Sequence, residues 1–140
     1  MEYKVSFSSE SQFEKFVRAN YSQFDPSFQE MSESTYYCHK LYTKSTIYEC
    51  WEDNDLVGVL CVYVNNEKKF AYIPYLCISS QFTQKGIASK LLHNIFLLKG
   101  IDRIELEVRI KNQSAYNLYI KNGFLEIGRN QEKIQLKRFL

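Results

Sequence analysis

The residues of this 140-residue chain that are best suited to binding or catalysis lie where a polar loop leads into an apolar helix. Gly86 and Ala88 stand at this junction, and their minimal side chains let a ligand approach the backbone. The first N–H groups of a helix have no partner within it, and the positive end of the helix dipole lies beside them. Such a helix start favours a phosphate or pyrophosphate. An ordinary structural glycine is the alternative explanation of the same residues.

A second set of chemically capable residues belongs to a predicted strand. Glu105, Glu107 and Arg109 alternate with Leu106 and Val108, and this period of two is typical of a strand with two different faces. If the strand is central in its sheet, its charged face must border a cleft, because charged groups are not buried in a core. A strand face that is merely solvated, or whose carboxylates form salt bridges with Arg109, is the alternative.

Hydrophobic periodicity, helix caps and turn residues predict the elements that must position these groups. In chain order we expect a strand (3–7), a helix bearing Phe13, Phe16 and Val17, a helix from Asp25–Pro26 to about Tyr42, three strands (47–51, 56–64 and 70–78), a helix from Gly86 to Gly100, a strand (104–110), a short helix ending at Asn122–Gly123, and two strands (124–127 and 133–139).

This order predicts an α/β fold with a mixed, mostly antiparallel sheet of about seven strands flanked by about four helices. The three central strands are joined by short polar turns, which indicates an antiparallel meander. A helix separates strand 70–78 from strand 104–110, and a connection of that length permits parallel pairing of the two strands.

Composition narrows the class of protein. With 45% hydrophobic and 24% charged residues, the chain has the size and core of one domain spanning residues 1–140. Its interspersed charges sum to +2, which argues against a nucleic-acid partner. Four widely spaced cysteines and two histidines lack zinc spacing, so no metal is expected. The longest apolar run is too short to cross a membrane, and the amino end does not resemble a signal peptide, so a cytoplasmic location is expected.

Two motifs together resemble a known family, the GNAT (GCN5-related N-acetyltransferase) superfamily. The family's N-x-x-A-x-x-L-Y-x-x-x-G-F pattern is matched by Asn112, Ala115, Leu118, Tyr119, Gly123 and Phe124. The segment Thr-Gln-Lys-Gly-Ile-Ala at 83–88 is similar to the family's acyl-CoA pyrophosphate loop, although Thr83 stands where the family usually has Arg or Gln. The expected order of elements agrees over essentially the whole chain. The resemblance therefore implies a single-domain GNAT-like fold.

The resemblance also implies where acetyl-CoA binds as cosubstrate. The backbone of the strand before the loop, at a bulge where it separates from its neighbour, is expected to pair with the pantetheine amides. Asn112 either caps its helix or bonds the pantetheine arm. The expected cofactor-binding residues are Leu76, Cys77, Ile78, Gln84, Lys85, Gly86, Ile87, Ala88, Ser89, Asn112 and Tyr119.

Chemistry and resemblance together suggest two catalytic residues. The attacking amine must be neutral, so a general base is needed, and the departing CoA thiolate benefits from a proton donor. Tyr119 matches the position of the family's acid, and a tyrosine packed with its hydroxyl satisfied is the alternative. Glu107 matches the base proposed for the branch that acetylates protein amines. Tyr72 is the aromatic residue most expected to face the acceptor.

The predicted function is transfer of an acetyl group from acetyl-CoA to a primary amine, by direct attack in a ternary complex. A non-catalytic acyl-CoA-binding sensor or interaction domain is the first alternative, and an unrelated phosphate-ligand domain is the second. The acceptor is either a small molecule or a protein amine, because no motif marks the region from Ser8 to Thr46 where acceptor choice is expected to reside. No nucleic acid or membrane partner is expected, and the chain is expected to be a monomer or a homodimer.

Overall fold

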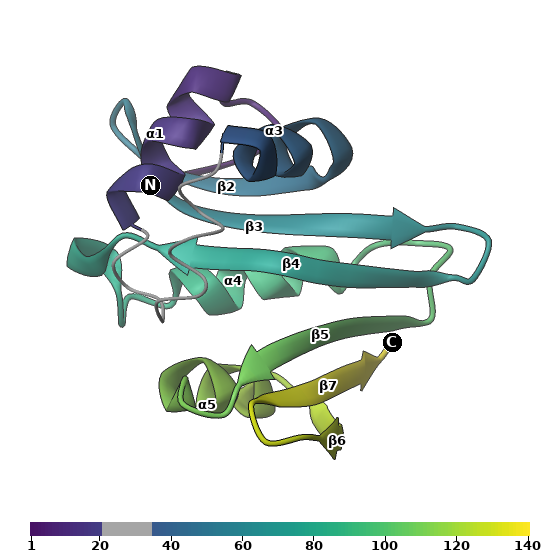
Figure 1. The fold of residues 1–140 in the computed structure, drawn as a ribbon. Helices are drawn as coiled ribbons and strands as arrows, with labels where there is room; N and C mark the ends of the chain where they lie inside the picture. Colours follow the sequence, from purple (N-terminus) through teal and green to yellow (C-terminus); the bar gives the residue numbers. More distant parts are fainter. Residues whose placement is uncertain (21–34) are drawn as a thin grey trace.

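The computed structural model describes residues 1–20 and 35–140, which form one seven-stranded sheet in the order β1-β2-β3-β4-β5-β7-β6 (Figure 1). The elements are β1 (Glu2–Val5), α1 (Glu10–Asn20), α3 (Thr35–Lys44), β2 (Thr46–Glu52), β3 (Asp55–Asn65), β4 (Phe70–Ile78), a short 3-10 turn η2 (Ser80–Phe82), α4 (Ile87–Ile95), β5 (Arg103–Arg109), α5 (Gln113–Lys121), β6 (Leu125–Arg129) and β7 (Lys133–Phe139).

The predicted mixed sheet is confirmed, because β4 and β5 pair in parallel and every other described pair of strands is antiparallel. The helix start expected at Asp25–Pro26 lies outside the described residues, and α3 corresponds to the end of that expected helix. None of the helices in the described part of the chain is long and apolar enough to cross a membrane.

Helices lie on both faces of the sheet and divide the core in two. On one face α1 and α3 pack against β2, β3 and the end of β4, around Phe13, Val17 and Leu41. On the other face α4 and α5 pack against the middle of the sheet and β5, around Leu91, Leu92 and other buried residues. Figure 1 shows α1 and α3 beside β2 and β3, with α4 behind β4.

A bulge in β4 places an extra residue opposite β3. Tyr63 pairs with Tyr72 and Cys61 pairs with Tyr75, so two residues of β4 stand opposite the single residue between Cys61 and Tyr63. One of the two is Pro74, which has no N–H to donate to a ladder, and proline inside a sheet is tolerated at such bulges.

The bulge exchanges the two faces of β4. Before it, Ala71 and Ile73 belong to the core under α4. After it, Tyr75 and Cys77 belong to the core under α1 and α3. One inserted residue inverts the alternation of a strand, because successive side chains point to opposite faces. The alternately buried residues of β4 therefore contribute to both cores.

The parallel pairing of β4 with β5 is short. It covers three residue pairs, from Phe70 with Arg103 to Tyr72 with Glu105, although β4 continues to Ile78 and β5 to Arg109. The pairing ends directly before the bulge, where β4 bends. The remaining lengths of the two strands diverge, as Figure 1 shows, and leave an opening in the sheet.

Gly58 in β3 lets the start of α4 lie close to the sheet. A Cβ at this position would be 2.9 Å from Ile78 Cδ1 and 3.1 Å from Ile87 Cγ2, which is closer than ordinary van der Waals contact. Because Ile87 is the first residue of α4, the missing side chain sets the position of the N-terminus of that helix.

A buried carboxylate joins the N-terminal segment to the sheet. Glu49 of β2 has no exposed surface. Its oxygens accept hydrogen bonds from the Phe7 and Ser8 N–H groups (3.1 to 3.2 Å), the Ser8 hydroxyl (2.6 Å) and Trp51 Nε1 (3.0 Å). Each donor is thereby satisfied, and the turn between β1 and α1 is held against β2.

We predict that Glu49→Gln lowers the free energy of unfolding by about 1 to 3 kcal/mol, because the new amide N–H₂ would face groups that also donate and the charge-assisted bonds would be lost. Urea unfolding followed by circular dichroism measures the change. The matched control is Glu52→Gln on the same strand, whose exposed carboxylate lies 3.9 Å from the N-terminal amine and which is expected to change stability by less than about 1 kcal/mol. Equal effects of the two substitutions would contradict this role of Glu49.

Candidate active site

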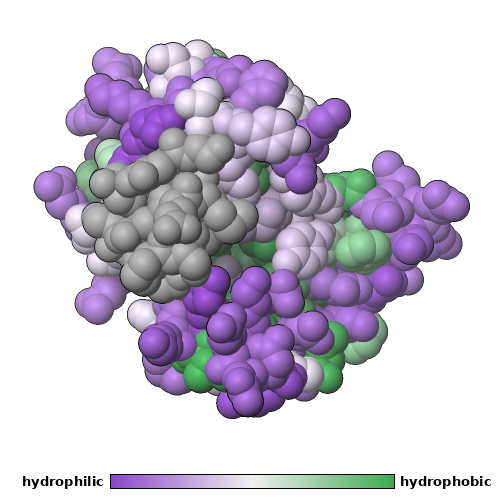
Figure 2. Space-filling view, viewed as in Figure 1, coloured by the Kyte–Doolittle hydropathy of each residue, from purple (hydrophilic) through white to green (hydrophobic). Residues whose placement is uncertain are grey.

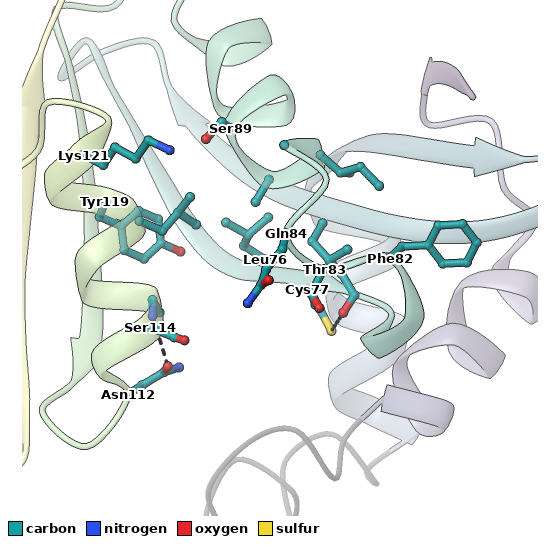
Figure 3. Close-up of a pocket in the computed structure, with 16 residues that line it drawn as sticks. Leu76, Cys77, Phe82, Thr83, Gln84, Ser89, Asn112, Ser114, Tyr119 and Lys121 are labelled. Atoms are coloured by element: carbon teal, nitrogen blue, oxygen red, sulfur yellow. Dashed lines mark hydrogen bonds between the residues drawn. The ribbon is translucent and has the colours of Figure 1, made fainter.

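A cleft of about 670 Å³ occupies the opening beyond the paired part of β4 and β5. The end of β4 and the N-terminus of α4 form one side, and α5 forms the other (Figure 3). Every residue expected to bind the cofactor lines this cleft except Lys85, which belongs to the same loop without lining it. The volume falls in the usual range for sites that bind small molecules and cofactors.

The loop before α4 presents open backbone to the cleft. Gln84 and Gly86 both adopt left-handed conformations, with φ of +62° and +80°. Gly86 is the N-cap of α4, no side chain caps this helix end, and the first intrahelical bond runs from Lys90 N–H to the Gly86 carbonyl. A Cβ on Gly86 would meet nothing within 4 Å, so open space lies in front of this residue. The position favours glycine because of its positive φ and not because of crowding. Backbone N–H groups in such an arrangement form a concave anion site.

The end of β4 offers a free strand edge to the same cleft. Leu76, Cys77 and Ile78 line it, beyond the last residue that pairs with β5. Because β3 occupies only the opposite edge, the peptide groups on the cleft side are available to an extended ligand. Cys77 is buried, and this burial raises the pKa of its thiol to about 12, so the thiol stays protonated at neutral pH and is a poor nucleophile.

Asn112 directly precedes α5 and borders the cleft. Its Oδ1 accepts a hydrogen bond from the Ala115 N–H at 3.2 Å, which is a helix N-cap and is drawn as a dashed line in Figure 3. Of the two expectations for this residue, the cap is therefore observed. A bond to the pantetheine arm stays a prediction.

Tyr119 is buried to 93% on α5, and its hydroxyl has no hydrogen-bond partner within the described ranges. Its ring packs edge-on against Phe124, with 5.5 Å between centroids. Figure 3 shows the hydroxyl pointing from α5 into the cleft, towards Leu76. Burial, with a smaller contribution from Tyr72, raises the pKa of Tyr119 above its ordinary value. The alternative expectation is that a hydrogen bond within the protein satisfies the Tyr119 hydroxyl. No described residue forms such a bond.

Glu107 lies outside the main cleft, in an adjoining hollow of about 120 Å³ that Tyr119, Leu76 and Asn112 also line. Its side chain is exposed, and its carboxylate accepts no hydrogen bond from any described residue. Glu107 forms no salt bridge with a described residue, since Arg109 lies 3.9 Å from Glu132 and Arg103 bonds Glu105. Its exposed side chain fits the solvated alternative as well as a catalytic role, which stays a prediction. The hollow brings the two residues expected to be catalytic to one place.

Several cleft residues were not expected from the sequence. Ser114, Ala115, Leu118 and Lys121 line the cleft from α5, and Phe82 lines it from η2. The residues on α5 recur at intervals of three and four, so the helical face that carries Tyr119 could have identified them. In Figure 3 the Lys121 ammonium reaches from α5 towards the start of α4.

One further contact crosses the cleft. Asn122 Nδ2 donates to Ser89 Oγ at 3.2 Å, and it also donates to the Leu118 carbonyl at 2.8 Å. Asn122 is in turn held by Arg138, whose Nε donates to its carbonyl at 2.9 Å. The end of α5 is thus tied to the first turn of α4.

Comparisons with known proteins concern the family and the fold. A family profile described as "Acetyltransferase (GNAT) family" matches residues 11–124. The L-amino acid N-acetyltransferase AaaT of Escherichia coli (strain K12) is 31% identical over 78 residues, which cover 51% of this chain and 48% of that protein. The chain thus matches about half the length of this curated relative.

Two solved structures share the fold. The PaiA N-acetyltransferase of Thermoplasma acidophilum, in complex with coenzyme A, superposes with a TM-score of 0.79 at 19% identity and covers 100% of both chains. A GNAT family acetyltransferase from Elizabethkingia anophelis with acetyl-CoA bound superposes with a TM-score of 0.65 at 19% identity, covering 76% of this chain and 84% of that one.

Proposed function

Since this chain belongs to the GNAT family of acetyltransferases, we propose that it transfers an acetyl group from acetyl-CoA to a primary amine. One observation carries the proposal: a single cleft joins an uncapped helix N-terminus to the hydroxyl of Tyr119, a buried residue, and no described residue bonds that hydroxyl. The first group suits a pyrophosphate, and the second suits the departing sulfur of the same cofactor. The curated relative is named for acetylating L-amino acids, which supports a small amine as acceptor here.

In the proposed complex, residues 84–89, which form the end of the loop and the first turn of α4, hold the pyrophosphate through backbone N–H groups. Thr83, which stands where the family usually has a longer donor, bonds its own loop instead, because its hydroxyl donates to the Ser80 carbonyl at 3.1 Å. The loop of this chain therefore relies on its backbone, and Lys121 supplies a cation from the facing helix. The pantetheine arm runs along the free edge of β4 at 76–78, which directs the thioester towards Tyr119.

The reaction follows from this placement. Glu107 takes a proton from the ammonium of the acceptor, and the neutral nitrogen attacks the thioester carbonyl carbon. The C–N bond forms as the C–S bond breaks, and Tyr119 gives its proton to the sulfur of the departing CoA. The nitrogen of the new amide then loses its extra proton to the Tyr119 oxygen, which restores the phenol, and Glu107 releases its proton to water. The raised pKa of Tyr119 keeps its phenol protonated and ready to donate across the neutral range.

We predict that Tyr119→Phe lowers kcat by about 10² to 10⁴-fold, as loss of general acid catalysis does, while the Kd for acetyl-CoA stays unchanged. Thiol release in the presence of a panel of amines measures turnover, and calorimetry measures cofactor binding. Tyr116→Phe, on the same helix with its hydroxyl bonded to Glu126, is the matched control and should retain wild-type kcat. Equal losses in turnover and affinity would assign Tyr119 a structural role. A wild-type protein that binds acetyl-CoA and acetylates no amine would instead be a sensor.

Glu107→Gln is expected to lower kcat/KM by about 10²-fold or more at neutral pH, because the carboxylate is the proposed proton acceptor. The loss should shrink as the pH rises, since a larger fraction of the amine is then neutral without a base. A pH profile of kcat/KM for both proteins tests this, with Glu132→Gln as the exposed control. A profile of unchanged shape and height would exclude Glu107 as the base.

A further inference from the structure

The sheet ends at β1, and no described strand pairs with the outer edge of this strand. The register with β2 shows which backbone groups face outwards. The Ser6 N–H donates to the Ile47 carbonyl at 2.7 Å, so these two residues form a hydrogen-bonded pair. Such pairs alternate along an antiparallel ladder, and the N–H and C=O groups of Tyr3 and Val5 therefore point away from β2. A further strand can pair with them.

The same strand carries a row of exposed apolar side chains. Met1, Tyr3 and Val5 alternate with Glu2 and Lys4, so the apolar and the charged side chains lie on opposite faces of the strand. The exposed fractions of the three apolar residues are 54%, 36% and 56%. Tyr3 and Val5 lie opposite residues of β2 that belong to the core under α4 or pack against it. The apolar row thus extends this core to the edge of the sheet, where it meets solvent.

The sequence of this edge is complementary to its own reverse. Residues 1–5 read Met-Glu-Tyr-Lys-Val. In an antiparallel pair of two copies centred on Tyr3, Glu2 of each copy lies opposite Lys4 of the other, and Met1 lies opposite Val5. Opposite charges that face each other across two strands stabilise the pair, whereas like charges destabilise it.

The outward backbone groups select the same register. Because they belong to odd-numbered residues, a second copy must also place odd-numbered residues opposite them. The register centred on Tyr3 meets this condition. Moving it by one step of the ladder in either direction also meets the condition, but brings Glu2 opposite Glu2 or Lys4 opposite Lys4. Backbone, apolar and charged groups are therefore matched together only when Tyr3 faces Tyr3.

The edge is also held in shape before any partner arrives. The Phe7 and Ser8 N–H groups donate to the buried Glu49 carboxylate, which fixes the end of β1 against β2. The Lys4 ammonium lies 3.9 Å from the centre of the Phe7 ring, so it is placed on the charged face of the strand. Glu2 is exposed and forms no ion pair with a described residue. An edge that is ordered in advance loses little conformational entropy on association.

The opposite edge of the sheet is less regular. β6 also exposes apolar side chains, with Leu125 58% and Ile127 52% exposed, but its register with β7 shifts between Glu126 and Gly128. A bulge of this kind disrupts pairing and is a common way to protect an edge strand from a partner. The register of β1 with β2 has no such shift.

The helices on the α1 side offer no comparable apolar surface. Figure 2, which has the orientation of Figure 1, shows mainly hydrophilic side chains over α1 and α3. Within the described residues of these two helices, Tyr36 is the one large hydrophobic side chain that is exposed. The exposed apolar surface at this end of the sheet therefore belongs to β1 and to Phe7, which follows it.

We propose that two copies of this chain associate through β1, in an antiparallel pair centred on Tyr3 that joins their sheets into one continuous sheet. The pairing has a two-fold axis and is closed after two copies. An interface of this size belongs to the weak, reversible class. The inference does not depend on the proposed function, because no residue of β1 lines the cleft and the opening beside β4 is three strands away from β1.

Sedimentation of the wild-type protein tests the association. Over a hundredfold range of concentration that ends at about 0.5 mM, we expect the mean mass to rise from that of a monomer towards that of a dimer. Hydrogen exchange of the Tyr3 and Val5 amides should slow as the dimer forms, because their N–H groups then bond the second copy. A monomer at every concentration would overturn the inference, and so would a dimer in which these amides exchange as fast as in the monomer.

Exchange of charges tests the register. Glu2→Lys and Lys4→Glu should each raise the Kd of the dimer by about tenfold or more, because each places like charges opposite each other at two positions. An equimolar mixture of the two variants should form a heterodimer of about wild-type affinity, because the lysines of one then face the glutamates of the other. Unchanged self-association of either variant, or no association in the mixture, would overturn the inference.

A matched pair of substitutions identifies the edge, and it decides the question if Lys4→Glu fails to fold. Val5 and Leu125 are similarly exposed, at 56% and 58%, on the two edge strands. Val5→Glu should raise the Kd at least tenfold, whereas Leu125→Glu should leave it unchanged. The reverse result would place the interface at β6 and overturn the inference. Thermal unfolding confirms that each variant is folded, and kcat for acetyl transfer should stay at the wild-type value, which separates this test from that of the proposed function.

Discussion

The site depends on the point where β4 and β5 stop pairing. After the pair of Tyr72 and Glu105, two strands of one sheet run on without a common ladder. Backbone groups without partners are costly unless water or a ligand satisfies them, so the opening is a place that a ligand with its own amide groups can stabilise. The bulge containing Pro74 accounts for the position of the opening, because proline cannot donate to a ladder and the extra residue bends the strand.

Several packing features hold the opening in a defined shape. Because Gly58 has no side chain, the N-terminus of α4 packs closely against β3. This packing fixes the position of the loop with Gln84 and Gly86 relative to the free edge of β4. On the other side, Asn122 ties α5 to Ser89 of α4. The anion-binding backbone and the tyrosine hydroxyl therefore belong to elements that contact each other directly, which fixes the distance between them.

Much of this arrangement could be predicted from the sequence, and the exceptions have physical reasons. Local patterns revealed the element order, the parallel step and the face of α5 with Tyr119, because periodicity and glycines act over a few residues. The exchange of faces within β4 was not visible, since both halves of the strand alternate in the same way on either side of Pro74. The bond from Asn122 to Ser89 and the bonds from Phe7 and Ser8 to Glu49 join residues far apart in the chain, and no spacing rule reports them.

The central claim is that the backbone around Gly86 grips the diphosphate of a cofactor whose arm then lies along β4 as far as Tyr119. Titration of the ¹⁵N-labelled protein with coenzyme A, followed by the amide signals of each residue, tests it most directly. The account predicts saturable shifts that are largest for residues 84–89 and 76–78, with little change in β1. Absence of saturation, or shifts concentrated on another face of the sheet, would contradict it.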